Sequence, residues 1–313
     1  MRLILICFAA VWMLGACSGA GGNAERTAAA PKAPVPDAVE ELPLPLVPST
    51  MTEPTDRAAF IAEHFWDTMD FADTLRSYDE AFMEQNFANF ANILPFVDRQ
   101  RAQSAVDRLM KGAEADSVAY GKLADIAEKY LYDPNSPMLD EESYILFLNA
   151  ITGSEFMDRD SRLRFESHLA DALKNRLGST AADFRYIDSH GARGSLHGLG
   201  GVYKLVVFYD PDCDVCRHAK EVLRSDPAVN AAVASGKLKV LAVYTDGDRE
   251  VWQRSKDDLP DNWISAYDPD GTVDRDEVYV LRATPTLYLI GPDNTVVIKD
   301  GRVEEMTAAA ADI

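Results

Sequence analysis

Hydrophobic residues recur with a helical period over residues 56–178, where runs of β-branched residues are few and Ala, Leu, Glu, Asp and Arg are common. Breaks fall at Pro95 and at residues 133–137, a stretch that includes two prolines. A region of about 120 residues can bury an independent core of packed helices, so we expect an all-α domain over residues 56–178. The predicted helices, several of which begin with the Asp or Ser typical of an N-cap, span residues 56–67, 78–94, 98–115, 117–132, 141–152 and 158–177.

After residue 183 the pattern changes to short β-favouring runs that alternate with helical segments. Alternation of strand and helix is typical of an α/β sheet. Residues 189–201 predict a loop, and residues 291–294 predict the turn of a hairpin that ends the domain. The predicted strands span residues 184–188, 205–209, 238–244, 287–290 and 295–299, and the predicted helices span residues 213–223, 228–234 and 248–257.

Two cysteines follow the buried run 205–209, at the point where the next helix begins. The run breaks at Asp210-Pro211, and Cys213 and Cys216 then fall on the first helical turn. The free N–H groups and the positive dipole end of a helix N-terminus favour a thiolate, which is the form that attacks disulfides. Because two intervening residues let one sulfur reach the other, we predict that Cys213 and Cys216 form a redox-active catalytic dithiol.

A C-x-x-C motif is also half of a zinc site, and the pair could instead be an inert structural disulfide. A structural zinc site needs four ligands, usually with a second Cys or His pair at short spacing. The other cysteines, Cys7 and Cys17, lie in the leader region, and the five histidines are scattered. We therefore expect no metal ligands, and the dithiol implies no cofactor.

The N-terminal residues 1–17 have the pattern of an export signal, with one positive charge, a short apolar run and the ending Leu-Gly-Ala-Cys. This ending resembles the lipobox of bacterial lipoproteins, and the resemblance implies that Cys17 carries a lipid anchor. An ordinary signal peptide or an uncleaved anchor remains the alternative. Residues 18–55 are rich in Pro, Ala and Gly and show no amphipathic period, so we expect a flexible linker.

The net charge of −20 argues against binding to nucleic acid. It equally disfavours contact with acidic lipid through a basic patch.

Residues 183–313 resemble the thioredoxin superfamily, through Cys-Asp-Val-Cys after a buried strand and Thr284-Pro285-Thr286 before the final hairpin. The resemblance implies a cis bond before Pro285, which faces the dithiol, and a Thr284 backbone that pairs with an extended substrate segment. The length of chain between the two motifs resembles the TlpA/ResA-like branch of membrane-anchored thiol:disulfide oxidoreductases. The cluster from His64 to Asp73 resembles the opening of an uncharacterised helical domain of bacterial envelope lipoproteins.

The sequence departs from these relatives where a proton acceptor for the second thiol would stand. Thioredoxin has an acid six residues before the first Cys, where this chain has Val207, and ResA-like proteins have a Glu at the position of Ala219. Glu221 is the remaining acidic candidate nearby.

Three carboxylates flank the first cysteine, namely Asp210, Asp212 and Asp214. Negative charge disfavours a thiolate, so we expect them to oppose ionisation of Cys213 and to give a low reduction potential.

The sequence thus predicts an α/β thioredoxin-like domain preceded by an all-α helical domain of unknown function. We expect a lipid-anchored thiol:disulfide oxidoreductase on the periplasmic side of a bacterial membrane, which reduces disulfides of exported proteins and takes electrons from a membrane thiol donor. The alternatives are a thiol peroxidase, or a binding lipoprotein whose helical domain holds a partner and whose disulfide is structural.

Overall fold

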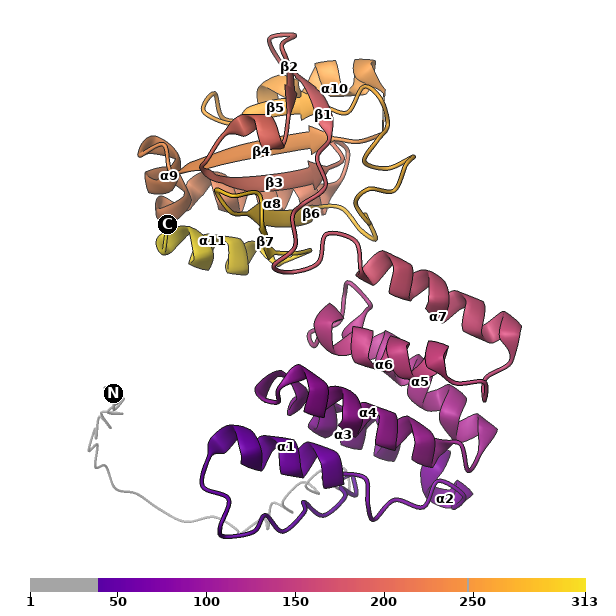
Figure 1. Ribbon diagram of the computed structural model, residues 1–313. Helices are drawn as coiled ribbons and strands as arrows, with labels where there is room; N and C mark the ends of the chain where they lie inside the picture. The colour runs from indigo at the N-terminus through magenta and orange to yellow at the C-terminus, as the bar shows by residue number, and fades with distance from the viewer. Residues whose placement is uncertain (1–38, 247) are drawn as a thin grey trace, which may run out of the picture. The chain divides into compact units, whose positions relative to one another are not determined.

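The structure is a computed structural model that describes residues 39–246 and 248–313 (Figure 1). The predicted signal peptide, Cys17 and residues 18–38 of the predicted linker lie outside the described residues. No helix within the described ranges combines the length and the apolar character that a bilayer-spanning segment needs.

The first half of the described chain is helical, as the sequence predicts. Most of its helices begin directly after an aspartate whose carboxylate accepts a hydrogen bond from a backbone N–H of the first turn, and these N-caps are Asp73, Asp79, Asp98, Asp116, Asp140 and Asp158. The short helix α2 was not predicted. The elements are α1 (Pro54–His64), α2 (Thr74–Ser77), α3 (Glu80–Ala91), the 3₁₀ turn η1 (Leu94–Phe96), α4 (Arg99–Ala113), α5 (Ser117–Leu131), α6 (Glu141–Gly153) and α7 (Arg159–Ala172).

Aromatic side chains fill the centre of the helical half. Phe65 lies with its ring centroid 5.8 Å from that of Phe90, and Phe87 lies 5.3 Å from Phe147. Trp66 packs into the same core. The sequence around His64 therefore serves packing, while the His64 imidazole itself stays at the surface.

Helix α7 ends at Ala172, although the sequence predicted a helix to residue 177. Asn175 adopts a left-handed backbone conformation with φ 46°, which a helix cannot continue through. Its side-chain amide donates to the carbonyl of Val278 at 2.6 Å and accepts from the N–H of Ala182 at 2.7 Å. The segment after Ala172 is thus held by the second half of the chain instead of extending the helix.

The second half contains one mixed sheet with the strand order β2-β1-β5-β4-β3-β6-β7. Strands β3, β4 and β5 run parallel, and β6 runs antiparallel to β3. The strands are β1 (Arg185–Asp188), β2 (Arg193–Ser195), β3 (Tyr203–Tyr209), β4 (Leu238–Tyr244), β5 (Ile264–Tyr267), β6 (Thr286–Ile290) and β7 (Val296–Ile298).

Both faces of the sheet are covered, as the continuous apolar strands predict. Alternate residues of β3 enter different cores: Leu205 and Val207 pack with one cluster, while Val206 and Phe208 pack with the other. The helices that accompany the sheet are α8 (Asp214–Ser225), α9 (Pro227–Ala234), α10 (Arg249–Ser255) and α11 (Val303–Ala311), with 3₁₀ turns η2 (His197–Leu199) and η3 (Lys256–Asp258).

Among the elements of this half, β2, β5 and α11 lie outside the predicted strands and helices. Residues 193–195, within the predicted loop, form β2, where Gly194 pairs with Tyr186 and any Cβ at residue 194 would meet the Tyr186 ring at 2.5 Å. The chain also continues past the predicted terminal hairpin into α11, which buries Met306 and Ala310 against the sheet.

The cap of α9 provides a test of the local structure. Asp226 accepts hydrogen bonds from the N–H groups of Ala228 and Val229, each at 2.9 Å. Asp226→Ala should lower the free energy of unfolding by about 1 kcal/mol, because both donors lose their partner. Urea unfolding followed by circular dichroism measures the effect. Asp226→Asn keeps an acceptor and should lose much less, and an equal loss in both variants would contradict the capping role.

Candidate functional site

Cys213 and Cys216 lie at the N-terminus of α8, directly after the buried strand β3. Cys213 is the N-cap residue, and its Sγ accepts a hydrogen bond from the backbone N–H of Cys216 at 3.2 Å. Cys213 is partly exposed, whereas Cys216 is fully buried against the sheet. One sulfur is therefore open to an approaching disulfide, and the other lies behind it.

The two thiols differ in acidity. Burial opposes ionisation of Cys213, but the hydrogen bonds from Cys216 outweigh it and lower the pKa of the Cys213 thiol. Burial raises the pKa of Cys216 to about 11, and the hydrogen bond with Cys213 adds to this rise. At neutral pH the exposed sulfur is thus the better nucleophile, while the buried one keeps its proton.

The segment predicted to face the dithiol does so. The Thr284–Pro285 peptide bond is cis, as the resemblance implies, and the thiol of Cys213 donates to the carbonyl oxygen of Thr284 at 3.6 Å. Thr286, the next residue, begins β6 and pairs with Phe208 of β3. The structure therefore brings Cys213, Cys216, Thr284 and Pro285 together where β3 ends and β6 begins. Cys17 lies outside the described residues.

The acidic residues around Cys213 do not have the expected effect. The carboxylate of Asp210 accepts from the N–H of Asp212 at 2.8 Å, and Asp214 pairs with Arg217 at 2.6 Å. These carboxylates are turned to local partners, and the pKa of Cys213 is lowered. The flanking charges were expected to oppose ionisation of Cys213, but the net pKa of this thiol is lowered, because hydrogen bonds from Cys216 and its neighbours outweigh the opposing effects.

Lys220 is the charged residue near Cys216 that the sequence reasoning missed. It lies four residues beyond Cys216 on the same face of α8, and its ammonium group is 4.4 Å from the ring centroid of Tyr209. Burial lowers the pKa of Lys220, and the negative charge of an ionised Cys216 acts in the opposite direction. This cation can stabilise a thiolate at Cys216, and the i, i+4 spacing in the sequence was the available signal.

Glu221, the acidic candidate in the sequence, lies elsewhere. Its carboxylate pairs with Arg224 at 2.5 Å, and its side chain is 59% exposed. In the described ranges, no three His, Cys, Asp or Glu side chains come together in a way that could hold a metal ion.

Comparisons with known proteins cover both halves of the chain. Residues 16–175, about half of the chain, match a family model described as a domain of unknown function (DUF5106). A crystal structure of a thioredoxin-like protein from Bacteroides caccae is 34% identical, with a TM-score of 0.81, and the match covers 87% of this chain and 99% of that chain. This match spans both halves and confirms the predicted fold, a thioredoxin-like α/β domain that follows a helical region.

Two further solved structures are similar over less than half of this chain. The thioredoxin domain of a thiol-disulfide oxidoreductase from Bacteroides vulgatus is 26% identical over 44% of this chain and 96% of that chain, with a TM-score of 0.39. A thiol:disulfide interchange protein from Bacteroides sp. is 25% identical over 45% of this chain and 91% of that chain, with a TM-score of 0.39. No curated protein matches the chain.

The unequal acidity of the thiols can be measured by alkylation. With iodoacetamide, Cys213 should react first, and its rate should rise with pH around a midpoint below that of a free cysteine, about 8.5. Mass spectrometry of the modified peptides separates the two sites. Cys216→Ala removes the Cys216 thiol, which helps to lower the pKa of Cys213, but keeps the backbone N–H donor, so the midpoint should move upward only part of the way. Faster modification of Cys216 than of Cys213 would contradict the assignment.

Proposed function

Because this chain belongs to the DUF5106 family and its second half is thioredoxin-like, we propose that it is a thiol-disulfide oxidoreductase that works through Cys213 and Cys216. One observation carries the proposal. A partly exposed thiol with a lowered pKa caps a helix beside a buried thiol and a cis-proline segment. An inert structural disulfide needs neither the difference in acidity nor the open approach to one sulfur.

The chemistry is a two-step exchange. The Cys213 thiolate attacks one sulfur of a substrate disulfide, forms a mixed disulfide with it and releases the other substrate sulfur as a thiolate, which takes up a proton. Cys216 then loses its proton and attacks the Sγ of Cys213, which releases the second substrate thiol. The substrate gains two electrons, and the protein is left with a Cys213–Cys216 disulfide. Lys220 would stabilise the Cys216 thiolate in this second step.

The proposed direction is reduction of the substrate. A dithiol is a strong oxidant when its reduced form is strongly stabilised, as in the periplasmic oxidant DsbA. Within the described residues, the hydrogen bonds recorded at the Cys213 sulfur involve peptide groups, and the nearby Arg217 is paired with Asp214. The hydrogen bonds lower the pKa of Cys213 and Lys220 also acts on the thiolates, but with Arg217 paired elsewhere the reduced form gains less than a direct ion pair would give. This favours a reduction potential below that of the strong oxidants.

The setting that we propose is the bacterial cell envelope. The signal pattern and Cys17 support a lipid anchor on the periplasmic side of a membrane. The predicted linker 18–55 is too long at its C-terminal end, because Leu42 is buried in the helical core, its N–H donates to Asn86 at 2.7 Å, and α1 begins at Pro54. Disulfide-containing exported proteins would be the substrates, and a membrane thiol donor would restore the dithiol, because the compartment is oxidising. The net charge of −20 supports a protein that does not bind nucleic acid.

The reduction potential of the dithiol tests both activity and direction. The protein without residues 1–17, equilibrated against defined thiol and disulfide ratios, should give a value at or below about −270 mV, that of thioredoxin. Thiol content by mass spectrometry reports the oxidised fraction. A value near about −120 mV, that of the strong periplasmic oxidants, would show that the protein makes disulfides instead.

A variant supplies the control for the mechanism. Cys216→Ser keeps the attacking thiol but cannot complete the second step, so it should accumulate a mixed disulfide with an oxidised peptide. Cys213→Ser should form none under the same conditions.

The anchor is tested by fractionation of cells that produce the full chain. Cys17→Ser removes the only sulfur that the lipobox resemblance offers for lipid attachment, so the protein should move from the membrane fraction to the soluble fraction. Immunoblotting of the two fractions measures this shift. A variant that stays with the membrane although its size on the immunoblot shows that the leader has been cleaved would exclude lipid attachment at Cys17 as the anchor.

A further inference from the structure

The chain that leads to the cis-proline segment is held by the helical half. This connection, residues 277–283, lies between β5 and β6. It leads directly to Thr284, whose carbonyl accepts from the Cys213 thiol. Near its start, the Val278 carbonyl accepts from the side chain of Asn175 at 2.6 Å, and Glu277 lies 3.5 Å from the ammonium of Lys174. Both partners come from the segment that directly follows α7.

The end of the connection is held by Arg282. Its Nη1 donates to the carbonyl of Tyr132 at 2.8 Å, and its guanidinium lies 4.1 Å from the centroid of the Tyr132 ring. Tyr132 directly follows α5 in the helical half. Arg282 is only 12% exposed, so these contacts are formed largely away from water.

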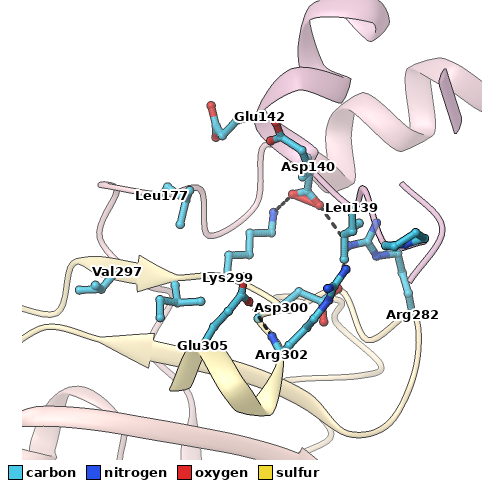
Figure 2. Close-up of a pocket in the computed structure, with 14 residues that line it drawn as sticks. Leu139, Asp140, Glu142, Leu177, Arg282, Val297, Lys299, Asp300, Arg302 and Glu305 are labelled. Atoms are coloured by element: carbon cyan, nitrogen blue, oxygen red, sulfur yellow. Dashed lines mark hydrogen bonds and ion pairs between the residues drawn. The ribbon is translucent and has the colours of Figure 1, made fainter. Parts of the chain in front are cut away.

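A buried ion-pair network surrounds the same guanidinium (Figure 2). Nη2 of Arg282 pairs with Asp300 at 2.7 Å and with Glu141 of α6 at 3.5 Å. Glu141 also pairs with Lys299, which is 7% exposed. Lys299 in turn donates to the carbonyls of Ala172 and Lys174, at 3.0 and 2.6 Å. The network therefore joins α6 and the end of α7 to the segment after β7 and to the residue that precedes Ala283-Thr284.

Such a network favours one geometry. A buried charge that loses its partner is costly, so each member holds the others in place. The fork of the guanidinium adds direction, because it serves Tyr132, Asp300 and Glu141 at once. On the other side of the cis bond, Thr286 is fixed by its pairing with Phe208. The Thr284–Pro285 segment is thus held between the sheet and the helical half.

We propose that the helical half positions the Thr284–Pro285 segment against Cys213, with Arg282 as the positioning residue. The helical half then acts on the exchange reaction without touching the substrate at the sulfur. It sets where the Thr284 backbone lies when an extended substrate segment pairs with it. This role rests on the proposed oxidoreductase function for its kinetic readout, while the geometry that it describes can be tested separately.

The test compares three variants of the full chain lacking residues 1–17. Arg282→Met removes the fork and the charge but keeps the length of the side chain, and Arg282→Lys keeps the charge. Arg302→Met is the matched control, because Arg302 donates to the carbonyl of Ser136 of the helical half at 3.1 Å from an exposed site outside the connection. Steady-state reduction of a peptide disulfide and alkylation of Cys213 are the readouts.

Arg282→Met should raise KM about tenfold, because the Thr284 backbone would no longer be held in the position in which it pairs with the substrate. The kcat should change less. Cys213 should be alkylated faster, since the Thr284 segment would no longer shield its sulfur. Arg282→Lys should restore part of both effects, and Arg302→Met should leave both unchanged. If Arg282→Met changes the melting temperature only, with KM and alkylation as in the wild type, the positioning role is wrong.

The two levels of the proposal fail separately. A wild-type protein that reduces no disulfide would overturn the proposed function, while the alkylation rates of the variants would still test the positioning. If Arg282→Met does not fold, Arg282→Lys provides the test. Its KM and its rate of Cys213 alkylation should both be higher than those of the wild type. Wild-type KM and alkylation in Arg282→Lys would then overturn the inference.

Discussion

A hydrogen bond from the backbone N–H of Cys216 to the sulfur of Cys213, 3.2 Å long, is the interaction on which the site depends. It exists because α8 begins at the residue after Cys213, which leaves first-turn N–H groups free for a sulfur acceptor. The start of α8 is in turn fixed by β3, which is covered on both faces. The sheet thus sets where the helix starts and, through this, one of the hydrogen bonds that lower the pKa of the exposed thiol.

Much of the fold could be predicted from local patterns. Strand β4 matches the predicted residues 238–244, and the aspartates that begin helices act as caps because a carboxylate satisfies N–H groups wherever a helix starts. Strand β2 could not be found in this way, since it is three residues long, contains Gly194 and is specified by the ring of Tyr186 from another strand. The helix α11 did have a sequence signal, in its strong helix formers and the spacing of Met306 and Ala310.

Some residues of the candidate site could likewise be predicted from local patterns, and others could not. Cys213 and Cys216 are close in sequence, so spacing alone brings them to one helical turn, and Lys220 could have been found from the same helical period. The net direction of the Cys213 pKa could not be predicted, because the sequence shows nearby charges but not which atoms they contact. Arg282 carries no local signal at all, since Tyr132 and Glu141 lie in the helical half and Asp300 lies 18 residues further along the chain.

The buried pairs between Glu141, Arg282 and Lys299 also have a thermodynamic consequence. The network includes residues from both halves, so a ligand that binds more tightly when the Thr284 segment is ordered would also stabilise the helical half. Because such coupling is reciprocal, a ligand of the helical half would change the affinity of the Thr284 segment for its own ligand by the same factor. Substrate engagement at the sulfur would then slow amide hydrogen exchange in α6, far along the chain from Cys213. Local opening of the helical half and binding of a substrate at the dithiol would then be thermodynamically linked.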